Sequence, residues 1–251
     1  MKKCAYCDIE TKLTKEHIWP KCMISRMPEL TFRYIASQEK FVKSELVISD
    51  VCSECNNEKL SNLDSYFCSL YDKFFIYFHE EKKQFVFEYD YELLLRSLLK
   101  INFNSSRTID KEENFFEKHK HFILEGGRAS ENIIVTLDIV TPCIVNGEKV
   151  YPKSMRCGIA DTGTKNENFI IRAVSVNSFY FYILMLKEEI LSNVAAEELK
   201  DVIKKIPGSI IHPYKTQTVI SDFSTSDSYD AHIDFINNTS EAFYKLYNSS
   251  R

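Results

Sequence analysis

The chain has 251 residues, of which 44% are hydrophobic, and this is enough apolar material to bury a core, so a disordered chain is excluded. Its formal net charge of -4 at pH 7 excludes a broad attraction to a polyanion, so any contact with nucleic acid has to be local. The amino terminus lacks the apolar core of a signal peptide, and the longest apolar run, Phe179 to Leu186, is too short to cross a bilayer. We therefore expect a soluble, cytoplasmic protein with no membrane partner.

The first 60 residues hold two cysteine pairs with the same spacing. Cys4 and Cys7 form one C-x-x-C pair, and Cys52 and Cys55 form the other. Four thiolates complete the tetrahedral ligand set of zinc, and in a cytosolic protein such pairs indicate zinc rather than disulfides. We expect these four cysteines to hold one structural Zn²⁺. We expect the remaining cysteines, which follow no spacing, to be buried apolar residues: Cys22, Cys68, Cys143 and Cys157.

The segment between the two cysteine pairs carries a Glu-His-x-x-Pro motif. Glu16 and His17 begin this motif, a strand is expected at 45–50, and Asn56 directly follows the last cysteine. Taken singly, these residues have ordinary structural alternatives. Glu16 can be a solvated carboxylate, His17 a histidine beside a zinc turn, and Asn56 a helix N-cap.

Beyond the second cysteine pair, hydrophobic periodicity predicts helices. Apolar residues at helical spacing over 60–78 predict one long helix that ties the amino-terminal part to a larger body. Alternation over 85–89 predicts a strand, after which Asp90 offers an N-cap to a leucine-rich helix. A further helix is expected near 111–124, ended by the glycines at 126–127.

The second half of the chain is dominated by strand patterns. We expect strands at 132–141, at 144–150 with a hairpin turn at Asn146-Gly147, at 154–160, at 168–176 and at 179–186. We expect helices at 195–206 and 239–247, and a polar loop at 221–230. Because helices and strands are interspersed without a βαβ rhythm, the predicted fold class is α+β. It comprises a small zinc-bound module at 1–75 and a larger mixed α+β domain at 76–251, whose role in partner or substrate binding the sequence does not reveal.

Taken together, the motifs at 4–64 resemble the HNH endonuclease family, whose ββα-metal fold is a hairpin and a helix around one catalytic metal. The order is C-x-x-C, Glu-His-x-x-Pro, strand, and C-x-x-C followed by Asn-Asn, which is similar to the zinc-stapled subgroup. The resemblance implies that His17 is the general base, because histidine titrates near neutral pH. It implies that Glu16 and Asn56 bind the catalytic metal, and their oxygen atoms favour Mg²⁺ or Mn²⁺.

Two lysines could add contacts to the substrate phosphate. Lys59 lies one turn after Asn56 on the same helix face, and Lys21 follows the proline of the Glu-His motif. Solvation at the surface is the alternative for both lysines.

The chain departs from the family pattern at Val47, where most members carry an asparagine that braces the histidine loop. We expect that brace to come from Ser49 or Asp50, or to be replaced by zinc and packing. Adjacent residues of a regular strand point to opposite faces. The segment containing Glu16 and His17 must therefore leave regular strand geometry if both are to face one phosphate.

Three further basic residues have a spacing or position that would suit a functional site. His119 and His121 alternate as metal ligands on a strand would, but they fall in a charged helical pattern, so we expect a solvated helix face. Arg107 follows the leucine-rich helix and could contact a phosphate, although an arginine at a helix end is ordinary.

These features favour a metal-dependent hydrolase that cleaves DNA phosphodiester bonds. By resemblance, the enzyme could be an effector of a bacterial anti-phage or restriction system that works beside a protein partner such as an ATPase. The alternative is a non-catalytic, zinc-stabilised module that binds nucleic acid or protein. Whether the substrate is DNA or RNA, and single- or double-stranded, stays open at this point.

Overall fold

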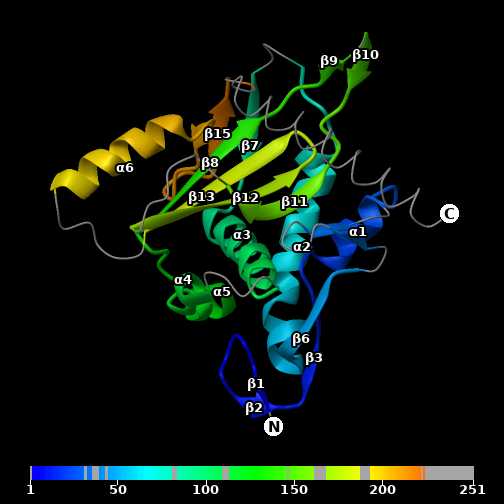
Figure 1. Cartoon of the computed structure of the whole chain (residues 1–251), viewed down its shortest axis with the longest axis vertical. Helices are drawn as coiled ribbons and strands as arrows, with labels where there is room; N and C mark the ends of the chain where they lie inside the picture. The colour runs from blue at the N-terminus through cyan, green and yellow to red at the C-terminus, as the bar shows by residue number, and fades with distance from the viewer. Residues whose placement is uncertain are drawn as a thin grey trace.

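The computed structural model describes residues 2–30, 33–35, 40–42, 45–80, 84–108, 113–145, 147–160, 168–186, 193–221 and 223. Over these residues the fold is mixed α+β, as the sequence predicts, with helices interspersed among several small sheets (Figure 1). The helix predicted at 239–247 and nearly all of the loop predicted at 221–230 lie outside the described residues.

Short antiparallel hairpins build the amino-terminal part. The elements, in chain order, are β1 (Lys2–Lys3), β2 (Glu10–Thr11), β3 (Leu13–His17), α1 (Lys21–Arg26), β4 (Arg33–Ile35), β5 (Lys40–Val42) and β6 (Val47–Cys52). Strand β1 pairs with β2, β3 with β6, and β4 with β5. Strand β6 confirms the strand predicted at 45–50, and the pair β3 and β6 places the Glu-His motif opposite the approach to the second cysteine pair.

A continuous helical stretch follows the second cysteine pair and confirms the long helix of the prediction. It consists of a π-helical segment η2 (Cys55–Lys59), the α-helix α2 (Ser61–Leu70) and a second π-helical segment η3 (Tyr71–Phe75). A π turn adds one residue to the helical repeat and therefore rotates the buried face. This explains why Phe75 is completely buried, whereas Phe74, which continues the helical spacing of the apolar residues Leu63, Phe67 and Leu70, is only partly buried.

Helix α3 (Tyr91–Ser106) lies at the centre of the molecule, beneath a five-stranded antiparallel sheet (Figure 1). The side chain of Asp90 accepts a hydrogen bond from the backbone N–H of Leu93, which confirms the predicted N-cap. The sheet has the order β11-β12-β13-β8-β14, with β8 (Ile133–Ile139), β11 (Met155–Ile159), β12 (Phe169–Val176), β13 (Phe179–Leu186) and β14 (Ser209–Ile210). Four of these strands confirm predicted strands, and the two-residue strand β14 is new.

The remaining elements surround this centre. They are β7 (Phe85–Glu88) paired with β15 (Gln217–Ile220), the hairpin of β9 (Cys143–Val145) and β10 (Glu148–Val150), and the helices α4 (Glu113–Glu117), α5 (Lys120–Glu125) and α6 (Asn193–Lys205). The single helix predicted near 111–124 is therefore two short helices, and the second ends at Gly126 with φ of 76°. The hairpin and helix α6 confirm their predictions.

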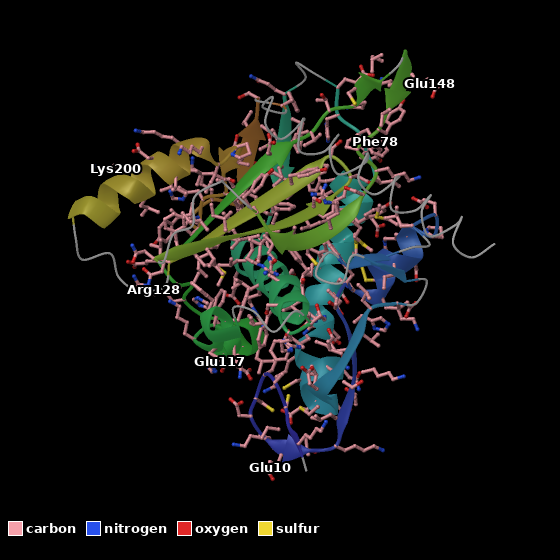
Figure 2. The ribbon with its side chains drawn as sticks, viewed as in Figure 1. Glu10, Phe78, Glu117, Arg128, Glu148 and Lys200 are labelled. Atoms are coloured by element: carbon pink, nitrogen blue, oxygen red, sulfur yellow. A yellow bond between two sulfur atoms is a disulfide. The ribbon has the colours of Figure 1, made fainter. Side chains whose placement is uncertain are left out.

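One buried apolar cluster extends through both predicted domains. It joins Cys4 and Phe67 of the amino-terminal part to Phe103 of α3 and Phe181 of the sheet. Figure 2 shows side chains filling the space between α3 and the sheet, and Glu10 and Glu148 at opposite ends of the molecule. Phe75, at the predicted domain boundary, packs against Phe67 of the amino-terminal part and Phe179 of the sheet, with ring centroids 5.5 and 4.9 Å away. The core is thus continuous across residue 75, and the division into two domains there stays a prediction.

The unpaired cysteines of the sequence do not all behave as expected. Cys22 of α1 and Cys68 of α2 form a disulfide, with their Cα atoms 6.3 Å apart, so the prediction of two separate apolar residues is wrong. Their pairing could not be read from a separation of 46 residues, because helix packing brings them together. Cys143 is buried with a free thiol, as predicted, while Cys157 is a free thiol that is only partly buried.

No helix among the described residues is long and apolar enough to cross a membrane.

Candidate functional site

The four cysteines of the two C-x-x-C pairs lie close together. Cys4 and Cys7 come from the turn between β1 and β2, Cys52 ends β6, and Cys55 begins η2. All four sulfur atoms lie within 4.8 Å of one another, and the Sγ atoms of Cys7 and Cys52 are 3.8 Å apart. Sulfur ligands about 2.3 Å from a tetrahedral zinc ion are themselves about 3.8 Å apart. The cluster therefore could bind a metal such as zinc.

The electrostatics of the cluster also favour a cation at its centre. Burial raises the pKa of Cys4, but backbone N–H groups, of which that of Cys52 lies 3.3 Å from the sulfur, outweigh this effect and lower the pKa to about 7. The pKa of Cys55 is raised, first by burial and then by the neighbouring sulfur atoms. The protein alone thus stabilises the thiolate of Cys4 but disfavours a second thiolate at Cys55, because the two negative charges would repel each other. A bound cation would offset this repulsion.

The Glu-His motif lies at the carboxyl end of β3, beside an irregularity in the pairing with β6. The register shifts between Thr14 and Glu16, after which Glu16 faces Ile48 and His17 faces Val47. Glu16 is only 4% exposed, whereas the side chain of His17 is 24% exposed. The irregularity therefore does not turn both side chains toward solvent. Glu16 is buried in the protein, whereas His17 is partly accessible.

The imidazole of His17 is held by a carboxylate. Its Nε2 lies 2.7 Å from Oε2 of Glu45, which is itself about half exposed. A hydrogen bond at one ring nitrogen orients the ring and leaves the other nitrogen available for proton transfer. Glu45 belongs to no motif of the sequence and was not predicted. Because Val47 faces His17 in the register, Glu45 is a diagonal neighbour on the same face of the hairpin, which is the signal that could have found it.

The carboxylate of Glu16 is directed into the protein. Its Oε1 lies 2.7 Å from Nζ of Lys100, which comes from α3 and is 1% exposed, and 3.3 Å from Nδ2 of Asn104. The same ammonium group contacts Oδ1 of Asp64 in α2, whose pKa is raised by burial despite that contact. A divalent cation on Glu16 would have to share this carboxylate with Lys100, and metal ligation by Glu16 stays a prediction.

Asn56 links the start of the helical stretch to β3. Its Nδ2 donates hydrogen bonds to Oγ1 of Thr14 and to the carbonyl of Lys15, both at 2.9 Å. The alternative role as a helix N-cap is wrong, because Glu54 occupies that position and Asn56 lies inside η2. This tether uses the amide nitrogen of Asn56, and metal ligation by its oxygen stays a prediction.

Among the described residues, the side chains of Ser49 and Asp50 make no hydrogen bond to the Glu-His motif, so the predicted brace from either residue is wrong. The Asp50 carboxylate instead accepts from Nε of Arg107 at 2.9 Å, and the guanidinium lies 4.0 Å from the ring centroid of Phe103. Arg107 is thus engaged inside the molecule. The amides of Asn56 and Asn104 hold the backbone of this strand.

The two lysines expected near a phosphate differ in their surroundings. Lys21 is exposed at the start of α1. Lys59 is paired with Glu125 of α5 at 2.5 Å and with Glu54 at 3.5 Å, and the hydrogen bond to Glu125 raises its pKa. Contact of either lysine with phosphate stays a prediction, and for Lys59 it requires the substrate to displace two carboxylates.

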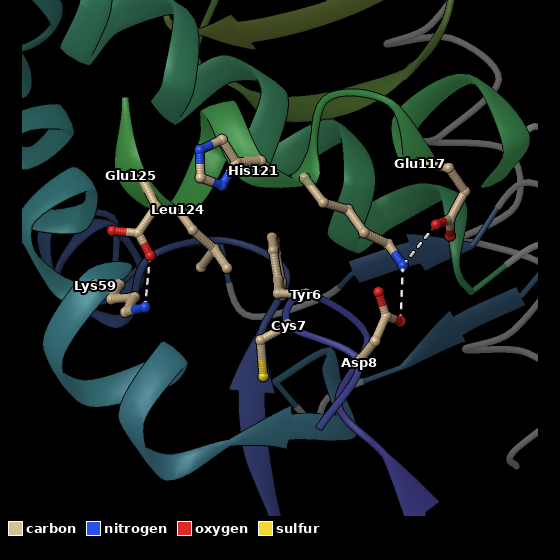
Figure 3. A pocket seen from close by; sticks show the side chains of 9 residues that line it. Tyr6, Cys7, Asp8, Lys59, Glu117, His121, Leu124 and Glu125 are labelled. Atoms are coloured by element: carbon tan, nitrogen blue, oxygen red, sulfur yellow. Dashed lines mark hydrogen bonds and ion pairs between the residues drawn. The ribbon is translucent and has the colours of Figure 1, made fainter. Parts of the chain in front are cut away.

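Lys59 lines a pocket of about 350 Å³ between the cysteine cluster and the short helices α4 and α5 (Figure 3). The other lining residues are Tyr6, Cys7, Asp8, Glu117, Lys120, His121, Leu124 and Glu125. Lys120 pairs there with Glu117 at 2.6 Å and with Asp8 at 3.4 Å. Because the acidic and basic groups pair with each other, the pocket offers no uniform charge to an anionic ligand, and it does not include His17.

The two histidines near α5 have opposite environments. His121 is exposed, as the prediction of a solvated helix face requires. His119 is only 4% exposed and its Nε2 has no hydrogen-bond partner among the described residues, so the prediction is wrong for this residue. It is the N-cap residue of α5 and directly precedes the first residue of that helix. Burial, with a smaller effect of Lys118, lowers the pKa of His119 to about 4.

The buried imidazole predicts a fall in stability in mild acid. His119 must gain a proton on unfolding below pH 6.5, so its contribution to stability is complete above that pH and is lost as the pH falls toward 4. Between pH 7 and pH 5 we expect the free energy of unfolding to drop by about 2 kcal/mol from this residue. Urea unfolding at both pH values should show the drop, and His119→Phe should remove it. An equal drop in His119→Phe, or its removal by His121→Gln, would contradict this assignment.

The charged residues of helices α2 and α3 that are linked to Glu16 by ion pairs stand in no motif of the sequence and were not predicted. Lys100 stands among buried leucines in α3, and Asp64 stands on the buried side of α2 between Leu60 and Phe67. A charged residue in an apolar helix face needs a buried partner, which is a signal that the sequence contains. What the sequence does not contain is the identity of that partner.

Comparison of the chain with protein-family models, with curated proteins and with solved structures found no match.

Proposed function

We propose that the chain is a metal-dependent HNH endonuclease that hydrolyses DNA phosphodiester bonds. The observation that carries this proposal is the partly exposed imidazole of His17, oriented by Glu45 on the strand pair β3 and β6, whose end is fixed by the four-cysteine cluster. A histidine with one nitrogen held and the ring accessible is suited to act as a general base. The motifs at 4–64 supply the family resemblance.

In the proposed reaction His17 takes a proton from the water that attacks the phosphorus atom. If Nε2 donates to Glu45, the ring accepts the proton at Nδ1, and the carboxylate of Glu45 stabilises the imidazolium that forms. The hydrogen bonds of Asn56 to Thr14 and Lys15 hold β3 against the helix and so fix the direction of approach. Lys21 and Lys59 are the proposed phosphate contacts.

Two metals belong to this proposal. Structural Zn²⁺ is assigned to Cys4, Cys7, Cys52 and Cys55, whose sulfur spacing fits a tetrahedral site. The proposed ligands of a catalytic Mg²⁺ or Mn²⁺ are Glu16 and Asn56. When bound, this cation would neutralise charge on the phosphate and on the departing oxygen.

We place the enzyme in the cytoplasm, as an effector of a bacterial anti-phage or restriction system. A chain with a net charge of -4 has little general attraction to DNA, which favours delivery to its substrate by a protein partner such as an ATPase. Residues 76–251 are the proposed surface for that partner.

A second candidate is a zinc-stabilised binding module without catalysis. The contact of Glu16 with Lys100 favours it, because a carboxylate held by a buried ammonium has a structural role already. The two candidates make opposite predictions for His17, since only the nuclease needs an imidazole at this position.

The deciding experiment compares His17→Ala with the unaltered protein on supercoiled plasmid, in the presence of Mg²⁺ or Mn²⁺. We expect the unaltered protein to nick the plasmid and His17→Ala to be at least about 100-fold slower, because the general base is lost. The matched control is His121→Ala, which removes an exposed histidine elsewhere and should nick normally. Both variants should retain their bound zinc. Equal nicking by His17→Ala, or no nicking by the unaltered protein with any candidate partner present, would favour the binding module.

A further inference from the structure

Helix α3 lies outside residues 4–64, yet it supplies two side chains to the Glu-His motif. Lys100 and Asn104 are four residues apart and therefore lie on the same face of the helix. Lys100 contacts the carboxylate of Glu16, and Asn104 reaches both residues of the motif. The larger part of the chain thus takes part in building the site that the amino-terminal motifs define.

Asn104 is completely buried and all of its polar atoms are used. Its Nδ2 donates to the carbonyl oxygen of His17 at 3.0 Å and lies 3.3 Å from Oε1 of Glu16. Its Oδ1 accepts from the hydroxyl of Tyr6 at 2.6 Å and from Nη2 of Arg107 at 3.0 Å. Because two donors meet Oδ1 and two acceptors meet Nδ2, the orientation of the amide is fixed.

The peptide group that follows His17 is therefore held from two sides. Its carbonyl accepts from Asn104, and its N–H, which belongs to Ile18, donates to the carbonyl of Leu46 at 3.0 Å. On the opposite strand, the position facing His17 is Val47, whose side chain can donate no hydrogen bond. The donor that fixes the carbonyl of this motif thus comes from α3.

We infer that Asn104 is a positioning residue for His17: its amide fixes the backbone from which the imidazole reaches its substrate. This inference rests on the proposed nuclease function. A displacement of about 1 Å at a catalytic group can cost about 100-fold in rate, even when the changed residue touches no substrate. Loss of the Asn104 amide should therefore slow the chemical step without weakening DNA binding.

The test uses Asn104→Leu, which keeps the branched shape of the side chain and removes both the donor and the acceptor of the amide. We expect kcat for plasmid nicking to fall by about 10- to 100-fold while KM changes by less than about 2-fold. The matched control is Asn102→Leu. Asn102 lies two residues away on α3, is equally buried, and faces the sheet, where Oδ1 accepts from Nε of Arg172 at 3.1 Å. Both variants lose buried hydrogen bonds, but only Asn104→Leu should lower kcat.

A second readout does not depend on catalysis. Amide hydrogen exchange at Ile18, followed by NMR under conditions where each variant is folded, should be about 10-fold faster in Asn104→Leu than in the unaltered protein and unchanged in Asn102→Leu. Wild-type exchange at Ile18 in Asn104→Leu would overturn the inference, and so would a kcat equal to that of the control. If the unaltered protein nicks no DNA, the nuclease proposal fails, and with it the role of Asn104 in catalysis. In that case, faster exchange at Ile18 in Asn104→Leu would still show that Asn104 holds this backbone, so the failure would lie in the nuclease proposal and not in the positioning contact.

Discussion

Replacing Cys55 with alanine is expected to remove bound zinc and to unfold the amino-terminal part of the chain. Cys55 is 1% exposed and its sulfur belongs to the four-cysteine cluster. Structural zinc sites contribute on the order of 10 kcal/mol or more to folding, which is comparable with the whole stability of an ordinary domain. Metal analysis should find about one zinc in the unaltered chain and none in Cys55→Ala. Limited proteolysis should cut the variant first within residues 2–30.

Cys143→Ala is the matched control for this experiment, because Cys143 is also a buried free cysteine but lies in β9, outside the cluster. It should retain the zinc and resist proteolysis as the unaltered chain does. A folded Cys55→Ala chain that lacks zinc would show that packing alone supports the hairpin of β3 and β6. That result would remove zinc from the proposed architecture.

Replacing Lys100 with methionine is expected to have the second largest effect. The variant leaves the carboxylates of Glu16 and Asp64 without the ammonium group between them, and Glu16 is 4% exposed. Breaking a buried ion pair by removing one partner costs about 3–5 kcal/mol, because the remaining charge stays buried and uncompensated. Urea unfolding at pH 7 should show this loss as a lower transition midpoint with an unchanged slope.

Lys59→Met provides the comparison on the protein surface. Lys59 also contacts two carboxylates, those of Glu125 and Glu54, but solvent and salt screen these pairs. We expect its unfolding midpoint to be close to that of the unaltered chain. If both variants lowered the unfolding midpoint by a similar amount, water would screen the contacts of Lys100 with Glu16 and Asp64 as it screens those of Lys59. A double variant that also carries Glu16→Gln should recover part of the Lys100→Met loss, since it removes one of the two orphaned charges.

Most of the regular elements could be predicted from local patterns. Strands β12 and β13 are long apolar runs, Asp90 marks the start of α3, and both features depend only on residues close in sequence. The elements that were missed lack such patterns. Strand β14 has two residues and forms only because Ser209 and Ile210 pair with β8, and the burial of Phe75 in place of Phe74 follows from a π turn that no sequence period indicates.

The residues of the candidate site that belong to sequence motifs could be predicted. The contacts that depend on how distant elements pack together could not. Equal C-x-x-C spacing was enough to predict that four cysteines meet, and their sulfur atoms do. The contacts of Glu16 could not be predicted, because its partner Lys100 is 84 residues further along the chain and is selected by how α3 docks. The same applies to Glu45, whose contact with His17 depends on the register of β3 and β6.

The distance along the chain between Glu16 and Asn104, 88 residues, has a consequence for protein synthesis. A ribosome completes the cysteine pairs and the Glu-His motif long before it completes α3. Until α3 has emerged and docked, the carbonyl of His17 and the carboxylate of Glu16 lack the partners that hold them. A nascent or prematurely terminated chain that lacks α3 would therefore carry the Glu-His motif without these contacts, and we expect such a fragment to be inactive in the proposed nuclease reaction.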